Sequence, residues 1–194
     1  MGHEEAFVKP PVLRKGDCVG LVAPSSPFQQ EALEAGIRFL EDEGFHVKHR
    51  PDLLERRKGF LAGADQERAD ELQGMFEDPG VHAVFVVRGG YGAQRILDRL
   101  DPERIRDHPK IFLGYSDATC LLTFLLQTAR LVCFHGPVVN EMGTLSDVTR
   151  DCLLRLLTTG EPLGPIPSGD IRWIRTGLAK APIVGGNLSL LCAT

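Results

Sequence analysis

The sequence predicts an α/β fold in which a parallel sheet has helices on both faces. Short apolar runs of strand length alternate along the chain with longer stretches whose apolar residues recur at helical spacing. One run, Ala83-Val84-Phe85-Val86-Val87, is apolar without a break, which is typical of a strand buried on both faces. With 194 residues, of which 43% are hydrophobic and 25% charged, the chain is long enough to bury a core without disulfides or metal.

The first half of the chain predicts strands and helices in alternation. Leu33, Ile37 and Leu40 recur at helical spacing, and Gly44 marks the end of that helix. The turn Asp78-Pro79-Gly80 ends the next helix. In order, the expected elements are a strand at 18–23, a helix at 29–43, a strand at 45–49, a polar loop at 51–63, a helix at 65–77 and a strand at 83–87.

The second half continues this alternation. Its expected elements are a helical stretch at 93–100, a strand at 111–113, a helix at 117–128, a strand at 131–134 and a helix at 149–158, with Cys152, Leu153, Leu156 and Leu157 facing inward. Strands that alternate with helices in this way favour a Rossmann-like or flavodoxin-like parallel sheet.

The composition changes after residue 160, where proline and glycine become frequent. This change predicts an N-terminal α/β domain at 1–160, a linker at 161–184 and the truncated start of a C-terminal domain at 185–194. In the last segment Asn187 is an expected N-cap, and the apolar helix that follows is not finished. Either these residues are a frayed tail or the chain is the first part of a longer protein, and we expect the second.

Three loops follow strands of the predicted sheet at their carboxyl ends. They are Pro24-Ser25-Ser26, Arg88-Gly89-Gly90-Tyr91-Gly92 and Gly114-Tyr115-Ser116-Asp117. Ligands of parallel α/β sheets bind beyond this edge, so we expect the three loops to converge on one pocket.

Ser116 is the candidate nucleophile because it lies between an expected strand and an expected helix. In such a turn the hydroxyl is lifted off the sheet, and the first N–H groups of the helix face the space where an oxyanion forms. The pattern departs from Gly-x-Ser-x-Gly, since Ala118 replaces the second glycine. The alternative interpretation is that Ser116 or Asp117 only caps the helix.

The composition disfavours several classes of protein. A net charge of −4 gives no large positive field for binding nucleic acid, which leaves only a local basic patch open, and the cluster Arg56-Arg57-Lys58 is interpreted as a solvated loop. No apolar stretch approaches the roughly 18 residues of a membrane span. The five cysteines are widely spaced, as expected for buried, reduced thiols. The first residues lack the features of a secretion signal, so a cytoplasmic location is the default.

Six short segments occur in the order and at the spacing of a known family. They are Val22-Ala23-Pro24-Ser25-Ser26, Phe60-Leu61-Ala62-Gly63 with Asp65 and Arg68, Arg88-Gly89-Gly90-Tyr91-Gly92, residues 109–117, Phe134-His135-Gly136-Pro137 and Gly185-Gly186-Asn187-Leu188. On these segments the sequence resembles the LD-carboxypeptidase family of serine peptidases, which includes murein tetrapeptide carboxypeptidases and microcin C self-immunity peptidases. The resemblance implies hydrolysis of the bond between an L-centre diamino acid and a terminal D-alanine in peptidoglycan recycling.

The resemblance also implies roles for particular residues. Ser116 is the expected nucleophile, and the backbone N–H groups of Asp117 and Gly90 are the expected oxyanion hole. The expected substrate-binding residues are Arg88, Gly89 and Tyr91. The resemblance further implies no metal or organic cofactor, a murein peptide as substrate, no nucleic-acid or membrane partner, and a homodimer at full length.

In relatives, the base histidine and its orienting glutamate lie in a C-terminal domain, beyond the segment that begins at Gly185. No residue of this sequence matches either one. A serine hydroxyl is a poor nucleophile without a base, so we expect this chain alone to be nearly inactive. His135 is the nearest local candidate for a base, although a structural role is the favoured interpretation.

Two other functions stay open at this point. The first is a microcin-type immunity peptidase that cleaves an amide in a peptidyl-nucleotide. The second is a non-catalytic binding domain, which becomes the better account if the gene ends at Thr194. For the glycine loop at 88–92 the alternatives are a plain turn or a phosphate cradle, but its spacing is a poor match to Gly-x-Gly-x-x-Gly.

Overall fold

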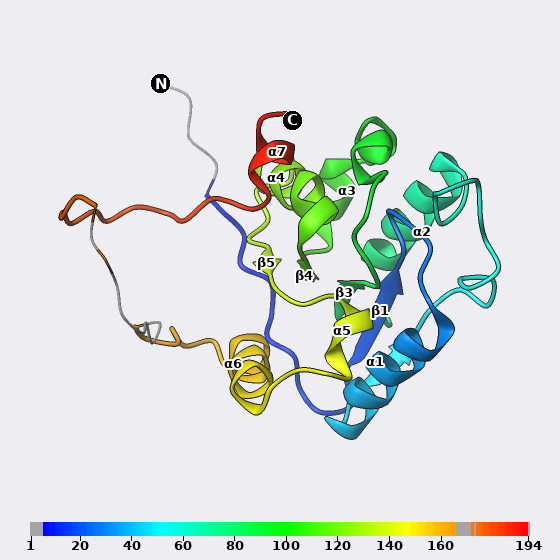
Figure 1. The fold of residues 1–194 in the computed structure, drawn as a ribbon, viewed down its shortest axis with the longest axis horizontal. Coiled ribbons are helices and arrows are strands. Elements are labelled where there is room, and N and C mark those ends of the chain that lie inside the picture. Colours follow the sequence, from blue (N-terminus) through cyan, green and yellow to red (C-terminus); the bar gives the residue numbers. More distant parts are fainter. Residues whose placement is uncertain (1–5, 166–171, 173, 194) are drawn as a thin grey trace.

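The computed structural model describes residues 6–165, 172 and 174–193, and it confirms the α/β fold (Figure 1). Five parallel strands form one sheet in the order β2-β1-β3-β4-β5. The strands are β1 (Cys18–Val22), β2 (His46–Lys48), β3 (Ala83–Val86), β4 (Ile111–Gly114) and β5 (Phe134–His135). This is the flavodoxin-like strand order, in which the chain changes direction across the sheet between β1 and β3.

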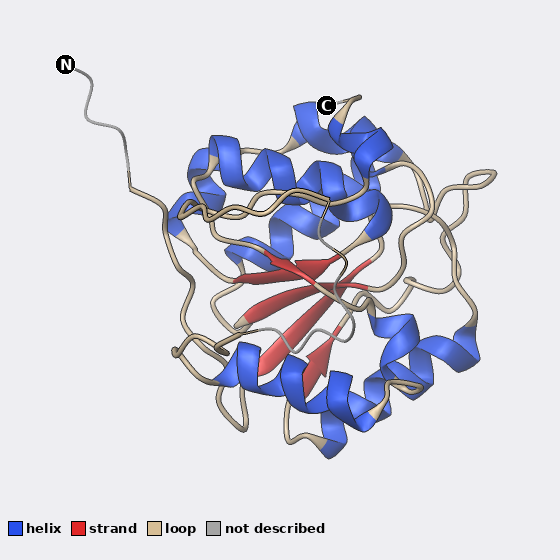
Figure 2. Cartoon of the chain, turned by 60° about the vertical axis from the view of Figure 1, so that its left-hand side comes forward, coloured by secondary structure: helices blue, strands red, loops and turns tan. Residues whose placement is uncertain are grey.

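Helices cover both faces of the sheet (Figure 2). They are α1 (Gln30–Asp42), α2 (Asp65–Glu77), α3 (Pro102–Asp107), α4 (Thr119–Thr128), α5 (Val139–Met142), α6 (Asp147–Thr158) and α7 (Leu188–Leu191), with 3₁₀ helices η1 (Ala93–Arg99) and η2 (Ser116–Ala118). Residues of α2, η1, α3 and α4 share one core, and residues of α1, α5 and α6 share the other. Val84 and Phe85 of β3 lie in opposite cores, which confirms that this strand is buried on both faces.

Several boundaries differ from the sequence prediction. The helix expected at 117–128 begins as η2 and continues as α4, and the last strand is Phe134–His135 rather than 131–134. Helices α3 and α5 were not predicted because they are too short to show a helical period. For α3 a local signal was present, since Asp101 caps it through the N–H groups of Glu103 and Arg104.

Side chains of α6 and the cysteines correct two further predictions. Leu153 and Leu157 are buried as expected, but Cys152 and Leu156 are exposed, because only a narrow stripe of α6 meets the core. All five cysteines are free, as predicted, yet only Cys120 is fully buried. The interpretation of the cysteines as buried thiols was therefore wrong for most of them.

The segment between α6 and α7 contains no helix or strand among the residues that the structure describes. At its end, Asn187 caps α7 by accepting from the N–H groups of Ser189 and Leu190, as predicted. The division into two domains and a linker stays a prediction. In the described ranges, no helix is both long and apolar enough to cross a membrane.

Candidate active site

Ser116 directly follows β4 and has a backbone conformation that is unusual for a serine. Its φ is 60°, in the left-handed region, which costs a residue with a side chain on the order of 1–3 kcal/mol. Such a conformation at a strand-to-helix turn presents the hydroxyl above the end of the sheet. In the part of the chain that the structure describes, the Ser116 hydroxyl makes no hydrogen bond, and the side chain is half-buried.

Small residues on either side of Ser116 allow the turn to close. A Cβ on Gly114 would lie 3.0 Å from the Cβ of Ala118 and 3.0 Å from a methyl group of Val86. Side chains at both positions 114 and 118 would therefore collide, unless one of the two residues is glycine. Alanine replaces the second glycine of the usual pattern without obstruction because Gly114 has no side chain.

The glycine loop after β3 passes close to Ser116. A Cβ on Gly89 would lie 3.0 Å from the Cβ of Ser116, 3.2 Å from its hydroxyl oxygen and 3.4 Å from the backbone nitrogen of Asp117. Gly90 has a φ of 111°, and a Cβ there would lie 2.3 Å from the hydroxyl oxygen of Ser26. Both positions require glycine, the first for close approach and the second for conformation as well.

A cavity of about 330 Å³ opens in front of Ser116. It is lined by Arg88, Gly89, Gly90, Tyr115, Ser116, Val138, Asn140 and Glu141. Four of the residues predicted for the site thus share this cavity. Tyr91 does not line it, because its ring packs edge-on against Phe60 with 5.6 Å between ring centroids.

The side chain of Asp117 holds two loops together rather than capping a helix. It is buried, and one carboxylate oxygen accepts from the Ser25 hydroxyl at 2.6 Å and from the Ala93 N–H at 2.9 Å. Neither η2 nor α4 has a side-chain cap. The capping interpretation is therefore wrong. The N–H of Asp117 lies in the first turn of its helix, where N–H groups have no intrahelical partner.

Arg68 of α2 binds the same two loops through their carbonyl groups. Its fully buried guanidinium donates to the carbonyl oxygens of Pro24 and Gly92, the latter at 2.8 Å. Pro24 and Gly92 directly precede Ser25 and Ala93 in the chain. In each loop, Arg68 therefore donates to a carbonyl oxygen, and the Asp117 carboxylate accepts from a donor of the next residue. We call Arg68 and Asp117 the loop brace. The brace was not predicted, because its bonds join segments that are far apart in the sequence.

A second buried pair supports the loop after β1. Glu71 accepts from the Ala23 N–H at 2.9 Å and from Arg56 at 2.6 Å. Burial raises the pKa of the Glu71 carboxyl, and Arg56 opposes that rise. The interpretation of the Arg56 cluster as a solvated loop was therefore wrong for Arg56, whose side chain is 5% exposed.

Tyr115 and Glu141 form a contact on the wall of the Ser116 cavity. The tyrosine hydroxyl donates to the carboxylate, which raises the pKa of the Tyr115 phenol. Glu141 belongs to α5, so sequence periodicity gave no sign of its place in the site.

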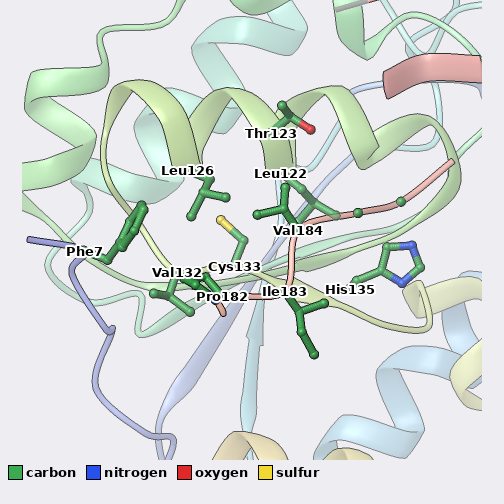
Figure 3. Close-up of a pocket in the computed structure, with 12 residues that line it drawn as sticks. Phe7, Leu122, Thr123, Leu126, Val132, Cys133, His135, Pro182, Ile183 and Val184 are labelled. Carbon is green, nitrogen blue, oxygen red and sulfur yellow. The ribbon is translucent and has the colours of Figure 1, made fainter. Parts of the chain in front are cut away.

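A larger, apolar cavity of about 630 Å³ lies beside α4 and β5 (Figure 3). Leu122 and Leu126 of α4 line it, with Phe7 at one end and His135 at the other. His135 does not line the Ser116 cavity, so the structure does not support it as a local base. Among the described residues, no three His, Cys, Asp or Glu side chains are grouped as metal ligands.

Comparison with known proteins identifies the family of this chain. Residues 19–136 match the family described as LD-carboxypeptidase N-terminal domain. A probable murein peptide carboxypeptidase of Bacillus subtilis strain 168 is 42% identical, over 96% of this chain and 59% of its own length. The microcin C7 self-immunity protein MccF of Escherichia coli is 29% identical, over 75% of this chain and 44% of its own.

A solved structure shows the same fold. The MccF-like protein from Bacillus anthracis str. Ames superposes with a TM-score of 0.73 at 31% identity, covering 78% of this chain and 47% of that one. The chain thus spans between 44% and 59% of the length of these three proteins. The matched segment contains all five strands except the first residue of β1, and it includes the Ser116 turn after β4. The chain belongs to the LD-carboxypeptidase family.

Proposed function

We propose that this chain is the N-terminal part of a serine-type LD-carboxypeptidase. Its substrate is a murein tetrapeptide, and the bond cleaved joins an L-centre diamino acid to the terminal D-alanine. The observation that carries the proposal is the left-handed Ser116 at the mouth of a cavity walled by the glycine loop. The relative named as a probable murein peptide carboxypeptidase supports the substrate class.

In the proposed mechanism the Ser116 hydroxyl oxygen attacks the carbonyl carbon of the scissile amide. The N–H groups of Asp117 and Gly90 stabilise the oxyanion that forms, and removal of one such donor typically costs about 10²–10³ in turnover. Collapse of the intermediate breaks the amide C–N bond, leaves an ester on Ser116 and releases D-alanine, whose nitrogen takes up the proton that Ser116 gave to the base. Water then hydrolyses the ester and restores the hydroxyl.

The proton of Ser116 needs a base, which we assign to the histidine of the family's C-terminal domain, oriented by a glutamate. The proposal therefore includes near-inactivity of the 194-residue chain by itself. It also includes a cytoplasmic location and a homodimer at full length.

The test measures D-alanine release from a murein tetrapeptide by the full-length protein and by the 194-residue chain, each with and without Ser116→Ala. The protein encoded by the whole reading frame is expected to turn over, and its Ser116→Ala variant to lose about 10³-fold or more. The 194-residue chain is expected to release no D-alanine. Normal turnover by Ser116→Ala would overturn the nucleophile. Turnover by the short chain, abolished by Ser116→Ala, would show that it contains its own base.

The similarity to MccF supports a second candidate, an immunity peptidase that cleaves an amide in a peptidyl-nucleotide. Its test is the same assay with an aminoacyl-sulfamoyl adenosine in place of the murein tetrapeptide. Preferential cleavage of that compound would favour the second candidate. Binding of either compound with no cleavage by the full-length protein would favour a non-catalytic domain.

A further inference from the structure

One wall of the Ser116 cavity carries two hydrogen-bond acceptors that the proposed chemistry does not use. Asn140 and Glu141 come from α5 and line the cavity together with Ser116. Their backbone is fixed, since the Asn140 N–H donates to the carbonyl of Val87 at 3.1 Å, directly after β3. Because α5 is held against the end of β3, these side chains have a defined position relative to Ser116.

Neither acceptor is saturated. The side-chain oxygen of Asn140 is buried and has no hydrogen-bond partner among the described residues. The carboxylate of Glu141 accepts from the Tyr115 hydroxyl, and a carboxylate has capacity for several more donors. A buried oxygen without a donor is unfavourable, so this wall is suited to a bound group that donates hydrogen bonds.

The charge of the wall restricts that group further. Glu141 brings a negative charge next to a neutral amide oxygen, whereas Arg88 brings a positive charge to the same cavity. A bound ammonium group has three donors and the opposite charge to Glu141, so it suits this wall better than a neutral or an acidic group. A carboxylate at this wall would meet a like charge and no donor except the tyrosine.

We propose that Glu141 and Asn140 bind the side-chain ammonium group of the diamino acid at the L-centre of the substrate. This proposal rests on the proposed function, in which the acyl residue is lysine or a similar diamino acid. It assigns α5 a role in specificity, because an acidic or apolar side chain at that residue loses the interaction. It also favours the murein substrate over acyl groups with acidic side chains.

The test measures binding to the full-length protein carrying Ser116→Ala, so that no hydrolysis occurs. Two tetrapeptides, L-alanyl-γ-D-glutamyl-L-lysyl-D-alanine and the same peptide with norleucine for lysine, differ only in the ammonium group. Calorimetry is expected to show about 10- to 100-fold tighter binding of the lysine peptide, as for a charge-assisted hydrogen bond. Because both peptides keep the same α-amino group, the ratio reports the side chain alone.

Variants locate the effect. Adding Glu141→Gln is expected to reduce the ratio to about threefold or less, and Asn140→Ala to lower it as well. The matched control is Glu103→Gln, an exposed glutamate of α3 outside the cavity, which is expected to keep the ratio. Equal affinities for the two peptides, failure to bind either one, or a ratio that Glu141→Gln leaves unchanged would each overturn the subsite.

Hydrolysis by the protein with Ser116 intact separates this proposal from the proposed function. Turnover of both peptides with equal affinities rejects the subsite and keeps the carboxypeptidase. A preference for the lysine peptide without any turnover keeps the subsite and rejects the carboxypeptidase.

Discussion

Removal of the Asp117 carboxylate is expected to destabilise the chain by about 3 kcal/mol. In Asp117→Ala, the Ser25 hydroxyl and the Ala93 N–H both lose their acceptor, and both residues are fully buried. A hydrogen bond to a charged group contributes about 1.5–3 kcal/mol, so two of them give about 3–6 kcal/mol. The variant no longer buries a charge, which offsets part of this loss and places the expected value at the lower end.

Asp117→Asn separates the hydrogen bonds from the charge. The amide keeps one oxygen that accepts from Ser25 and Ala93, but hydrogen bonds to a neutral acceptor are about half as strong. We therefore expect a loss of about 1 kcal/mol for this variant. The expected stability therefore rises from Asp117→Ala to Asp117→Asn to the unmodified protein, because the carboxylate accepts both hydrogen bonds.

The assay is urea unfolding of the 194-residue chain, followed by circular dichroism. Asp98→Ala is the matched control, because the Asp98 side chain is 80% exposed, and it is expected to change stability by less than about 0.5 kcal/mol. Hydrogen exchange at the Ala93 amide is expected to accelerate in Asp117→Ala. A loss no greater than that of the Asp98 control would refute the loop brace.

Three further predictions concern the same edge of the sheet. Ser116→Gly relieves the left-handed backbone and is expected to be about 1 kcal/mol more stable than Ser116→Ala in urea unfolding; equal stabilities would argue against strain. Gly90→Ala is expected to lose about 2 kcal/mol or more, because its new Cβ would meet Ser26 as well as adopt a positive φ. The matched control is Gly16, which also has a positive φ but has open space where a Cβ would lie. Gly16→Ala is expected to lose only about 1 kcal/mol of stability, and equal losses for the two variants would show that the contact with Ser26 has no effect. Hydrogen bonds from two arginines lower the pKa of Asp65 to about 2, so its stabilisation is present above the unfolded pKa of about 3.9 and is lost as the pH falls through 2. Asp65→Asn is expected to flatten the dependence of stability on pH in this window by about 1–2 kcal/mol, and a curve parallel to that of the unmodified chain would contradict the linkage.

The sequence predicted the fold and the edge of the sheet that carries the site, because both depend on local patterns. Apolar runs identify buried strands, and parallel strands bring their carboxyl ends together. These two rules are enough to place Ser116 beside the loop at Arg88–Gly90, where the folded chain has it. They place Tyr91 in the same group, but a residue's place in a loop does not fix the direction of its side chain.

Residues that act across long sequence separations could not be predicted in this way. Arg68 belongs to a segment that carries the family resemblance, but helical periodicity places it as a polar residue, and only the folded chain shows that it is buried against carbonyls of two loops. Glu141 lies in a helix of four residues, which gives no periodic signal. In both cases the information lies in the contact between segments and not in the pattern of either one.

The strain at Ser116 and the bonds around it have a common physical cause. A left-handed serine persists only where the surrounding structure leaves the backbone no alternative. Gly114 leaves room for Ala118 in the turn, and the carboxylate of Asp117 is hydrogen-bonded to the loops after β1 and β3. Those loops are in turn held by Arg68, so a motion that relaxed Ser116 would also strain the bonds that hold the loops after β1 and β3. The geometry of the hydroxyl and the shape of the cavity are therefore maintained by the same set of interactions.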